Sequence, residues 1–322
     1  MQALLDRRLI VLTGKGGVGK TTMAAALGMA ACATGRRTLV VEVGEQSRLT
    51  EIFGAREAEP GSETRLGPGL SGITIDPDRA LLEWLQALGG RVSGRVLASS
   101  GTFQYFAAAA PGAKELVSMV KIWQLTRGER RGRSPRHDLV ILDAPATGHA
   151  LGMLRSPDTF GAIARVGPIA KQTAEVSALL SDHDRSGYLA VAHGSEMAVT
   201  ETLELQSGLE DALGRELDGV IVNGLMPRRF SAGEMEQIQA LAPSENGRSG
   251  SARGAEVIAA AVHAANEVHD RGRFQHGQVA RLRRRGLSVL SIPFVWGGEL
   301  DLEGLQGIAS RLERGLVSND LD

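Results

Sequence analysis

The sequence predicts an α/β fold in which helices cover both faces of a doubly wound, mostly parallel sheet. Three observations support this prediction. Short apolar runs rich in β-branched residues recur along the 322 residues, helical stretches separate these runs, and a glycine-rich turn joins the first run to the first helix. Strands that are apolar throughout are typical of parallel sheets buried on both faces. The helices between them fit right-handed strand–helix–strand crossovers.

The elements can be placed in chain order. Buried parallel strands are predicted at 9–13, 38–43, 139–143, 188–193, 219–223 and 287–292, with a shorter strand at 72–76. The first helix is predicted from about Lys20 to Thr34, where Gly35 can cap its C-terminus. Asp76 and Pro77 resemble an N-cap followed by a first helical residue, so a further helix should begin there.

Two segments interrupt this alternation. Residues 78–136 look helical, and we predict that they form a helical insertion over the edge of the sheet. Its large aromatic side chains are Trp84, Phe103, Tyr105, Phe106 and Trp123, which favour an insertion core over a client groove. Residues 242–254 are rich in Gly, Ser and Arg and predict a mobile loop. The length would suit two small domains, but the chain contains no internal repeat, and we predict one domain over 1–322.

Composition narrows the function classes. The 36 basic and 37 acidic residues give a net charge of −1, without the basic excess typical of nucleic-acid binders, so no nucleic acid is expected. The single cysteine, Cys32, excludes an internal disulfide and a multi-cysteine metal site within one chain. No secretory signal precedes the first strand, and no apolar run reaches the roughly 18–20 residues that span a bilayer. We therefore expect a cytoplasmic protein without an integral membrane segment.

The stretch after the first strand predicts a phosphate-binding loop. The pattern Gly14-x4-Gly19-Lys20-Thr21 also contains Gly16, Gly17 and Val18, and Thr22 follows it. Glycines let backbone N–H groups approach phosphate oxygens, and the N-terminus of the next helix favours negative charge. In this pattern Lys20 reaches the β- and γ-phosphates and the Thr21 hydroxyl binds Mg²⁺.

A dinucleotide-binding loop is the alternative interpretation. Gly14-x-Gly16-x-x-Gly19 follows a strand, and Glu42 near the end of the next strand could bind a ribose hydroxyl. This alternative does not explain why Lys20, Thr21 and Thr22 follow the glycines, so the triphosphate interpretation is favoured.

A second lysine, Lys15, gives the loop a further resemblance. The sequence GKGGVGKTT resembles the deviant phosphate loop of a group of dimeric ATPases. The group includes nitrogenase iron protein, the septum-site and plasmid-partition ATPases, and the arsenite-pump and tail-anchored-protein-targeting ATPases. The resemblance implies that Lys15 crosses a dimer interface and contacts the partner's ATP, and that the dimer closes when ATP occupies the interface.

The stretch LVILDAPATGHALGMLRSP at 139–157 resembles the arsenite-pump and tail-anchored-targeting branch. The second switch of that branch reads Asp-Thr-Ala-Pro-Thr-Gly-His. Asp143 matches its leading aspartate, which implies a Mg²⁺ held through water. Thr147, Gly148 and His149 match the end of the switch, whereas Ala-Pro-Ala at 144–146 replaces its middle.

The resemblance also implies an adenine site. VIVNGLMP matches a strand that ends in an adenine-contacting asparagine, here Asn223, and LSIPF matches an adenine-flanking segment, here Pro293 and Phe294. The matching regions are 8–55, 138–158, 187–227 and 286–310, and the insertion resembles that of bacterial single-domain members.

The first switch departs from the branch. Its usual Ser-Thr-Asp-Pro-Ala-His contains the aspartate that positions the attacking water, but the matching stretch here is VEVGEQSRLTEIF at 41–53. Glu42 and Glu45 are both candidates for this role. The cysteines that bind metalloid, zinc or an iron–sulfur cluster in other members are also absent.

Three functions follow as hypotheses. The first is a Mg²⁺-dependent dimeric ATPase that switches between open and closed states to act on a client protein; the partner subunit could be a second copy or a sister ATPase. The second is a nucleotide-gated scaffold with negligible turnover. The third is a membrane-surface ATPase of the septum-site or partition type. The last would use the apolar stripe at 302–317 as an anchor, although such a stripe is more often core packing.

Overall fold

A computed structural model describes residues 4–56, 61–88, 112–127, 136–164, 166–242, 252–297 and 300–317. Within these ranges one sheet of eight strands has the order β3-β4-β2-β5-β1-β6-β7-β8. The strands are β1 Leu9–Gly14, β2 Thr38–Val43, β3 Thr64–Gly67, β4 Leu70–Ile75, β5 Leu139–Ala146, β6 Ser186–His193, β7 Gly219–Leu225 and β8 Val289–Pro293. The β3–β4 pair is antiparallel and the other neighbouring pairs are parallel. The predicted α/β fold with a doubly wound, mostly parallel sheet is confirmed.

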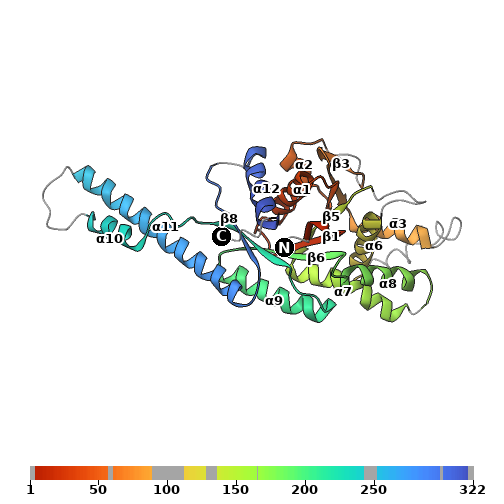
Figure 1. The fold of residues 1–322 in the computed structure, drawn as a ribbon. Coiled ribbons are helices and arrows are strands. Elements are labelled where there is room, and N and C mark those ends of the chain that lie inside the picture. Colours follow the sequence, from red (N-terminus) through yellow and green to blue (C-terminus); the bar gives the residue numbers. More distant parts are fainter. Residues whose placement is uncertain are drawn as a thin grey trace.

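Helices cover both faces of this sheet (Figure 1). The short helix η1 spans Leu4–Asp6, and the longer helices are α1 Lys20–Ala33, α2 Arg48–Phe53, α3 Pro77–Leu88, α6 Ala113–Arg127, α7 Thr147–Ile163, α8 Pro168–Ser181, α9 Glu196–Leu213, α10 Ala232–Ala240, α11 Ala252–Arg284 and α12 Leu302–Val317. Alternate residues of β1 face opposite layers, as the two-residue period of a strand requires. Leu9 and Val11 join the cluster formed with α6, α7, α8 and α9. Ile10 and Leu12 join the cluster formed with α1 and α12.

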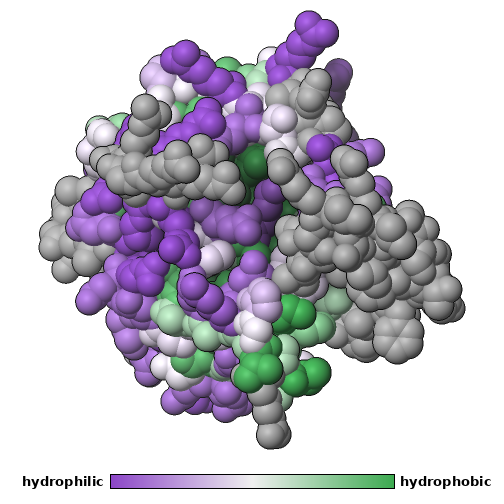
Figure 2. All heavy atoms as spheres, turned by 90° about the vertical axis from the view of Figure 1, so that its right-hand side faces the viewer, coloured by the Kyte–Doolittle hydropathy of each residue, from purple (hydrophilic) through white to green (hydrophobic). Residues whose placement is uncertain are grey.

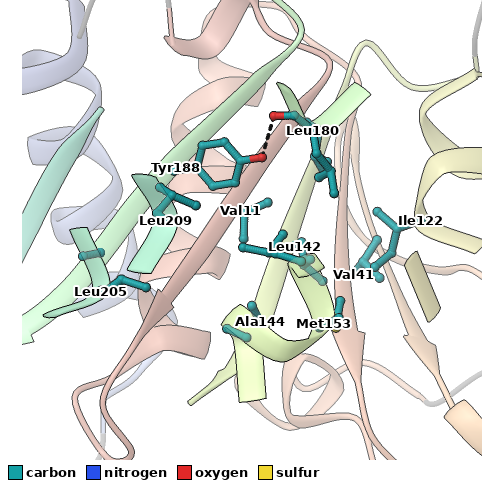
Figure 3. Packing of buried hydrophobic residues seen from close by; sticks show 14 of the residues in the cluster. Val11, Val41, Ile122, Leu142, Ala144, Met153, Leu180, Tyr188, Leu205 and Leu209 are labelled. Carbon is teal, nitrogen blue, oxygen red and sulfur yellow. Dashed lines mark hydrogen bonds between the residues drawn. The ribbon is translucent and has the colours of Figure 1, made fainter. Parts of the chain in front are cut away.

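The first of these clusters forms the larger core (Figure 3). Val11, Val41 and Leu142, from three neighbouring strands, pack with Ile122 of α6 and Met153 of α7. Trp123, which the sequence analysis expected in the core of the insertion, is buried in this cluster, and Trp84 of α3 packs against the cluster. The described parts of the insertion therefore contribute to the core rather than to an exposed groove. Phe103, Tyr105 and Phe106 lie outside the described residues.

The helix at 302–317 packs on α1. Its side chains Leu305, Ile308, Leu312 and Leu316 are buried in the second cluster, whereas Leu302 is 45% exposed. The apolar stripe is therefore committed to the core and is not available as a membrane anchor. Within the described ranges, no helix is both long and apolar enough to cross a lipid bilayer.

The loop predicted at 242–254 lies only partly within the described residues. In the region 242–254, residues 243–251 lie outside the described ranges, and α11 already begins at Ala252. The 33 residues of α11 form a helix about 50 Å long, which projects from the body together with α10 (Figure 1). At the opposite end, the described surface is mostly hydrophilic with apolar residues gathered in patches (Figure 2). Ile163 at the end of α7 and Val166 after it are 75% and 86% exposed.

Candidate functional site

The loop between β1 and α1 has the backbone that its glycines predict. Gly14, Gly17 and Gly19 have φ angles of 149°, 81° and 89°, which residues with a Cβ rarely adopt. A Cβ at Gly14 would lie 2.1 Å from the carbonyl oxygen of Val191, and one at Gly19 would lie 2.6 Å from Nδ2 of Asn223. The loop conformation therefore requires glycine at these positions. Gly16 differs, because a Cβ there would meet no atom within 4 Å.

A cavity of about 990 Å³ opens at the N-terminus of α1. The loop after β1, the end of β2 with the segment after it, and the C-terminal half of β5 meet there, because the carboxyl ends of parallel strands lie at one edge of a sheet. The lining residues are Gly17, Gly19, Lys20, Thr21, Thr22, Glu42, Val43, Gly44, Glu45, Gln46, Ser47, Arg48, Glu51, Ile52, Asp143, Ala144, Pro145 and Ala146. The fold thus brings five of the predicted phosphate-loop residues, both candidate acids and Asp143 around one space, called the phosphate cavity below. Gly14, Gly16 and Val18 of the loop do not line it.

Lys20 is folded over its own loop. Its ammonium group donates a hydrogen bond of 2.9 Å to the carbonyl oxygen of Lys15. Burial lowers the pKa of Lys20, and the nearby Asp143 carboxylate opposes that shift. The positive charge is held beside the helix N-terminus, where both attract anionic phosphate oxygens.

Asp143 and Thr21 form an oxygen pair suited to magnesium. The Thr21 hydroxyl donates to Oδ2 of Asp143 over 2.5 Å. Burial raises the pKa of Asp143 to about 6, and the charge of Glu42 adds to the increase. The second oxygen, Oδ1, is buried with no hydrogen-bond partner among the described residues. A buried acceptor without a partner is costly, and Mg²⁺ prefers such hard oxygen ligands. The residues present therefore fit a magnesium ion.

The two candidate acids of the first switch occupy different environments. Glu42 is buried and accepts hydrogen bonds from the Ser47 hydroxyl and from the backbone N–H groups of Arg48 and Leu49. Its carboxylate thereby holds the N-terminus of α2. Glu45 is exposed and lines the cavity. The carboxylate of Glu42 is thus occupied by hydrogen bonds to α2, whereas the carboxylate of Glu45 faces the cavity.

Lys15 points away from the cavity. Its ammonium group lies 2.7 Å from Oε1 of Glu201 on α9 and also contacts the sulfur of Met197. The side chains of Lys15 and Glu201 are both 32% exposed. The second lysine of the loop is therefore not part of the phosphate cavity of its own protomer.

The residues predicted for adenine gather at a second cavity of about 440 Å³. Asn223 at the end of β7 lines it and donates to the carbonyl oxygen of Val18 over 3.0 Å, while Pro293 and Phe294 line it from the end of β8. Thr22 lines both cavities, so they adjoin at α1. Residues of α11 complete the lining, and sequence reasoning missed them because no motif marks that helix.

The predicted second-switch residues begin α7. Thr147 is the first residue of α7, and Gly148 and His149 are exposed in its first turn. The preceding Pro145 offers its carbonyl oxygen to the Thr13 hydroxyl at 3.1 Å. These three residues do not line the phosphate cavity, but the chain runs directly from Asp143 into them. A displacement at Asp143 would therefore reach α7 within four residues.

Comparisons with known proteins identify the family. The model of the anion-transporting ATPase family matches residues 7–172, which include the phosphate loop, Asp143 and α7. The chain belongs to this ATPase family. The predicted resemblance to the arsenite-pump branch is thereby confirmed.

Individual relatives agree with this assignment. ATPase BagA of Mycobacterium tuberculosis is 31% identical over 230 residues, covering 68% of this chain and 66% of BagA. A putative arsenical pump-driving ATPase of Halobacterium salinarum is 28% identical over 244 residues, covering 70% of this chain but 36% of that protein. ATPase GET3 of Kluyveromyces lactis is 25% identical over 263 residues, covering 70% and 74%. This chain spans less than two thirds of the length of the first two proteins. The activity and partners of those whole proteins are therefore considered for this chain only as proposals.

Proposed function

We propose that this protein is a Mg²⁺-dependent ATPase of the cytoplasm that binds and hydrolyses ATP as a dimer and switches between open and closed states to act on a client protein. One observation carries the proposal: the glycine loop, Lys20 and the Asp143–Thr21 pair surround a single cavity at the carboxyl edge of the sheet. Membership in the anion-transporting ATPase family supports it independently.

The phosphates of ATP would lie on the loop. Backbone N–H groups from Gly16, Gly17, Val18 and Gly19 would hold the phosphate oxygens at the helix N-terminus. The ammonium group of Lys20 would leave the Lys15 carbonyl oxygen and bind the β- and γ-phosphates. Catalysis of this kind depends mostly on positioning and charge neutralisation.

The metal site would be formed by the Thr21 hydroxyl directly and by the Asp143 carboxylate through water. Bound there, Mg²⁺ would neutralise developing charge on the β- and γ-phosphate oxygens. The unpartnered Oδ1 of Asp143 supports this role, because the carboxylate has an oxygen left to accept from such a water. Of the two acids left open by the sequence, Glu45 is proposed to orient the attacking water, since Glu42 already holds α2.

Lys15 is proposed to act on the ATP of a partner subunit. Its ammonium group pairs with Glu201 on α9 of its own protomer. A partly exposed ion pair of this kind is weak, so Lys15 could leave Glu201 to bind a phosphate of the partner's ATP. The partner would be a second copy of the chain or a sister ATPase. The helix α7 would carry the change outward, because it begins at the second switch and ends at the 75% exposed Ile163.

Steady-state phosphate release with Mg²⁺ and ATP tests the proposal. Lys20→Ala should reduce turnover at least a hundredfold, because it removes charge stabilisation at the transferred phosphoryl group. Arg127→Ala changes an exposed side chain at the C-terminal end of α6, where it pairs with Glu175, and should leave turnover within twofold. Equal turnover in wild type and Lys20→Ala would refute hydrolysis at this loop.

A nucleotide-gated scaffold is the second candidate. The observation that favours it is the first switch, where Glu42 is hydrogen-bonded to the start of α2 and the exposed Glu45 makes no hydrogen bond to the described residues. ATP would then act through its different affinities for two conformations. Single-turnover measurements separate the two functions, since a cleavage rate slower than nucleotide dissociation supports the scaffold and a faster one supports the ATPase.

A further inference from the structure

One turn of α11 faces the second cavity. Arg271, Phe274 and Gln275 all line it, together with Asn223 and Phe294 from the far ends of β7 and β8. Their spacing of three and four residues places the three side chains on one face of the helix. The sequence analysis did not assign any function to this helix, so this wall is a feature of the tertiary structure alone.

Gln275 fixes the position of this turn. It is buried, and its side-chain oxygen accepts a hydrogen bond of 2.7 Å from the backbone N–H of Met226. The helix also lies close to the end of β6, since a Cβ at Gly194 would be 2.8 Å from Cβ of Gln275. This turn of α11 is therefore packed against the residues that follow β6 and β7. Strand β7 also carries Asn223, which contacts the glycine loop.

The side chains of Arg271 and Phe274 are exposed at this cavity. The phenyl ring of Phe274 is 51% exposed, and that of Phe294 on the same cavity is 41% exposed. Arg271 is exposed and makes no hydrogen bond or ion pair with the described residues. Half-exposed rings and an unpaired guanidinium facing one cavity are suited to a flat aromatic ligand, because rings stack on such a ligand and the cation lies over its face.

We propose that Arg271 and Phe274 form the second wall of a nucleoside site and hold the adenosine part of ATP against the wall made by Asn223, Pro293 and Phe294. Thr22 lines both cavities, so a nucleotide whose phosphates lie on the loop can extend its base into this space. The proposal rests on the proposed function, because it assumes that the triphosphate binds at the glycine loop.

Equilibrium binding of two ligands by the full-length chain tests the wall. ATP carries both the base and the phosphates, whereas inorganic tripolyphosphate carries the phosphates alone. In the presence of Mg²⁺, Arg271→Ala and Phe274→Ala should each weaken ATP binding by about tenfold and leave tripolyphosphate binding unchanged, because loss of one stacking contact acts on the base only. Phe274→Trp, which keeps an aromatic ring, should retain ATP affinity within about threefold.

Two controls make the result specific. Arg273 is exposed on α11 and does not line the second cavity, although the groove that it lines also includes Phe274. Arg273→Ala should therefore bind both ligands as wild type does. The melting temperature without ligand should stay unchanged in Arg271→Ala and Phe274→Ala, since both side chains are exposed. Lys20→Ala should weaken both ligands and so reports on the phosphate loop.

The possible failures are distinguishable. Wild-type affinity for ATP in both Arg271→Ala and Phe274→Ala, with Lys20→Ala weakened, overturns the nucleoside wall and leaves the proposed function intact. Equal weakening of ATP and tripolyphosphate in the two α11 variants also overturns it, since the effect is then not on the base. Failure of the wild-type chain to bind either ligand overturns the proposed function and this inference together.

Discussion

The carboxyl group of Asp143 occupies a buried position that is unfavourable for a charged side chain. It is buried next to Thr21, within the influence of the Glu42 charge, and one of its oxygens has no hydrogen-bond partner among the described residues. A group that were only structural would gain from being apolar or fully hydrogen-bonded at this position. An unpartnered buried oxygen is therefore what we expect of a carboxylate that binds a ligand, as proposed above for Asp143, and not of a purely structural one.

The raised pKa of Asp143 gives a pH-dependent prediction. Burial raises this pKa from 3.8 to about 6, so the folded protein binds the proton more tightly than the unfolded chain does. The resulting stability is present below about pH 4 and is lost as the pH rises to about 6, by roughly 3 kcal/mol. In magnesium-free protein, Asp143→Asn should therefore raise the free energy of unfolding at pH 7.5 and change it much less at pH 4.

Urea denaturation at the two pH values, without and with MgATP, measures this effect. Asp138→Asn is a suitable comparison, because its pKa is lowered to about 2 by hydrogen bonds from Arg37 and the substitution should destabilise the protein at both pH values. The magnesium-bound state should reverse the sign for Asp143→Asn, since the variant loses a ligand oxygen. An Asp143→Asn protein less stable than wild type at pH 7.5 without magnesium would contradict the argument.

At the scale of elements, apolar strands were the most predictable part of the fold. The six parallel strands and the short strand near 72–76 could be predicted because both faces of these strands are buried, so that nearly every residue in them is apolar. Strand β3 could not, because the edge sequence Thr-Arg-Leu-Gly has one apolar side chain of any size and pairs on one side only. The backbone of the glycine-rich turn was predictable, because Gly14 and Gly19 adopt positive φ angles at positions where a Cβ would clash.

Other parts of the site depend on contacts between distant segments and leave no local pattern. Lys15 meets Glu201 across 186 residues of sequence, and Arg271 reaches the cavity from a helix without a motif. The two acids of the first switch were indistinguishable in sequence, because their difference lies in the three groups that bind Glu42. The two acids can be distinguished only once the position of α2 is known, because the start of α2 donates hydrogen bonds to Glu42 and leaves Glu45 exposed.

The start of α2 gives a matched pair of variants. Glu42→Gln removes the charge from a buried acceptor of two backbone N–H groups and should lower the free energy of unfolding by about 1–2 kcal/mol. Glu45→Gln changes an exposed side chain and should alter the free energy of unfolding by less than about 0.5 kcal/mol. If Glu45 orients the attacking water, its variant should nonetheless reduce turnover at least tenfold at unchanged ATP affinity.

Denaturation and phosphate release measured on both variants decide the assignment. A stable Glu42→Gln protein with strongly reduced turnover, beside an active Glu45→Gln protein, would assign the water-positioning role to Glu42 instead.

At the scale of the whole molecule, the candidate site residues lie along one edge of the sheet. The phosphate cavity, the second cavity proposed to hold the nucleoside, and the Lys15–Glu201 contact all lie where β1, β2, β5, β6, β7 and β8 end. The two layers of helices support this edge from opposite faces, with α1 and α12 on one side and α7, α8 and α9 on the other. A partner subunit that faced this edge would meet the loop, α9 and both cavities at once.

Dimerisation would require Lys15 to exchange partners, because one ammonium group cannot serve both Glu201 of its own protomer and ATP of the other. Breaking a half-exposed ion pair costs about 0.2–1 kcal/mol. Glu201→Gln should therefore lower the ATP concentration for half-maximal dimerisation by up to about fivefold in light scattering, since 1.4 kcal/mol corresponds to about tenfold. Glu204→Gln, an exposed change on the same helix, should leave it unchanged, and Lys15→Ala should abolish dimerisation. If Lys15→Ala dimerises with ATP as wild type does, the lysine does not act across the interface, and its contact with α9 is its structural role.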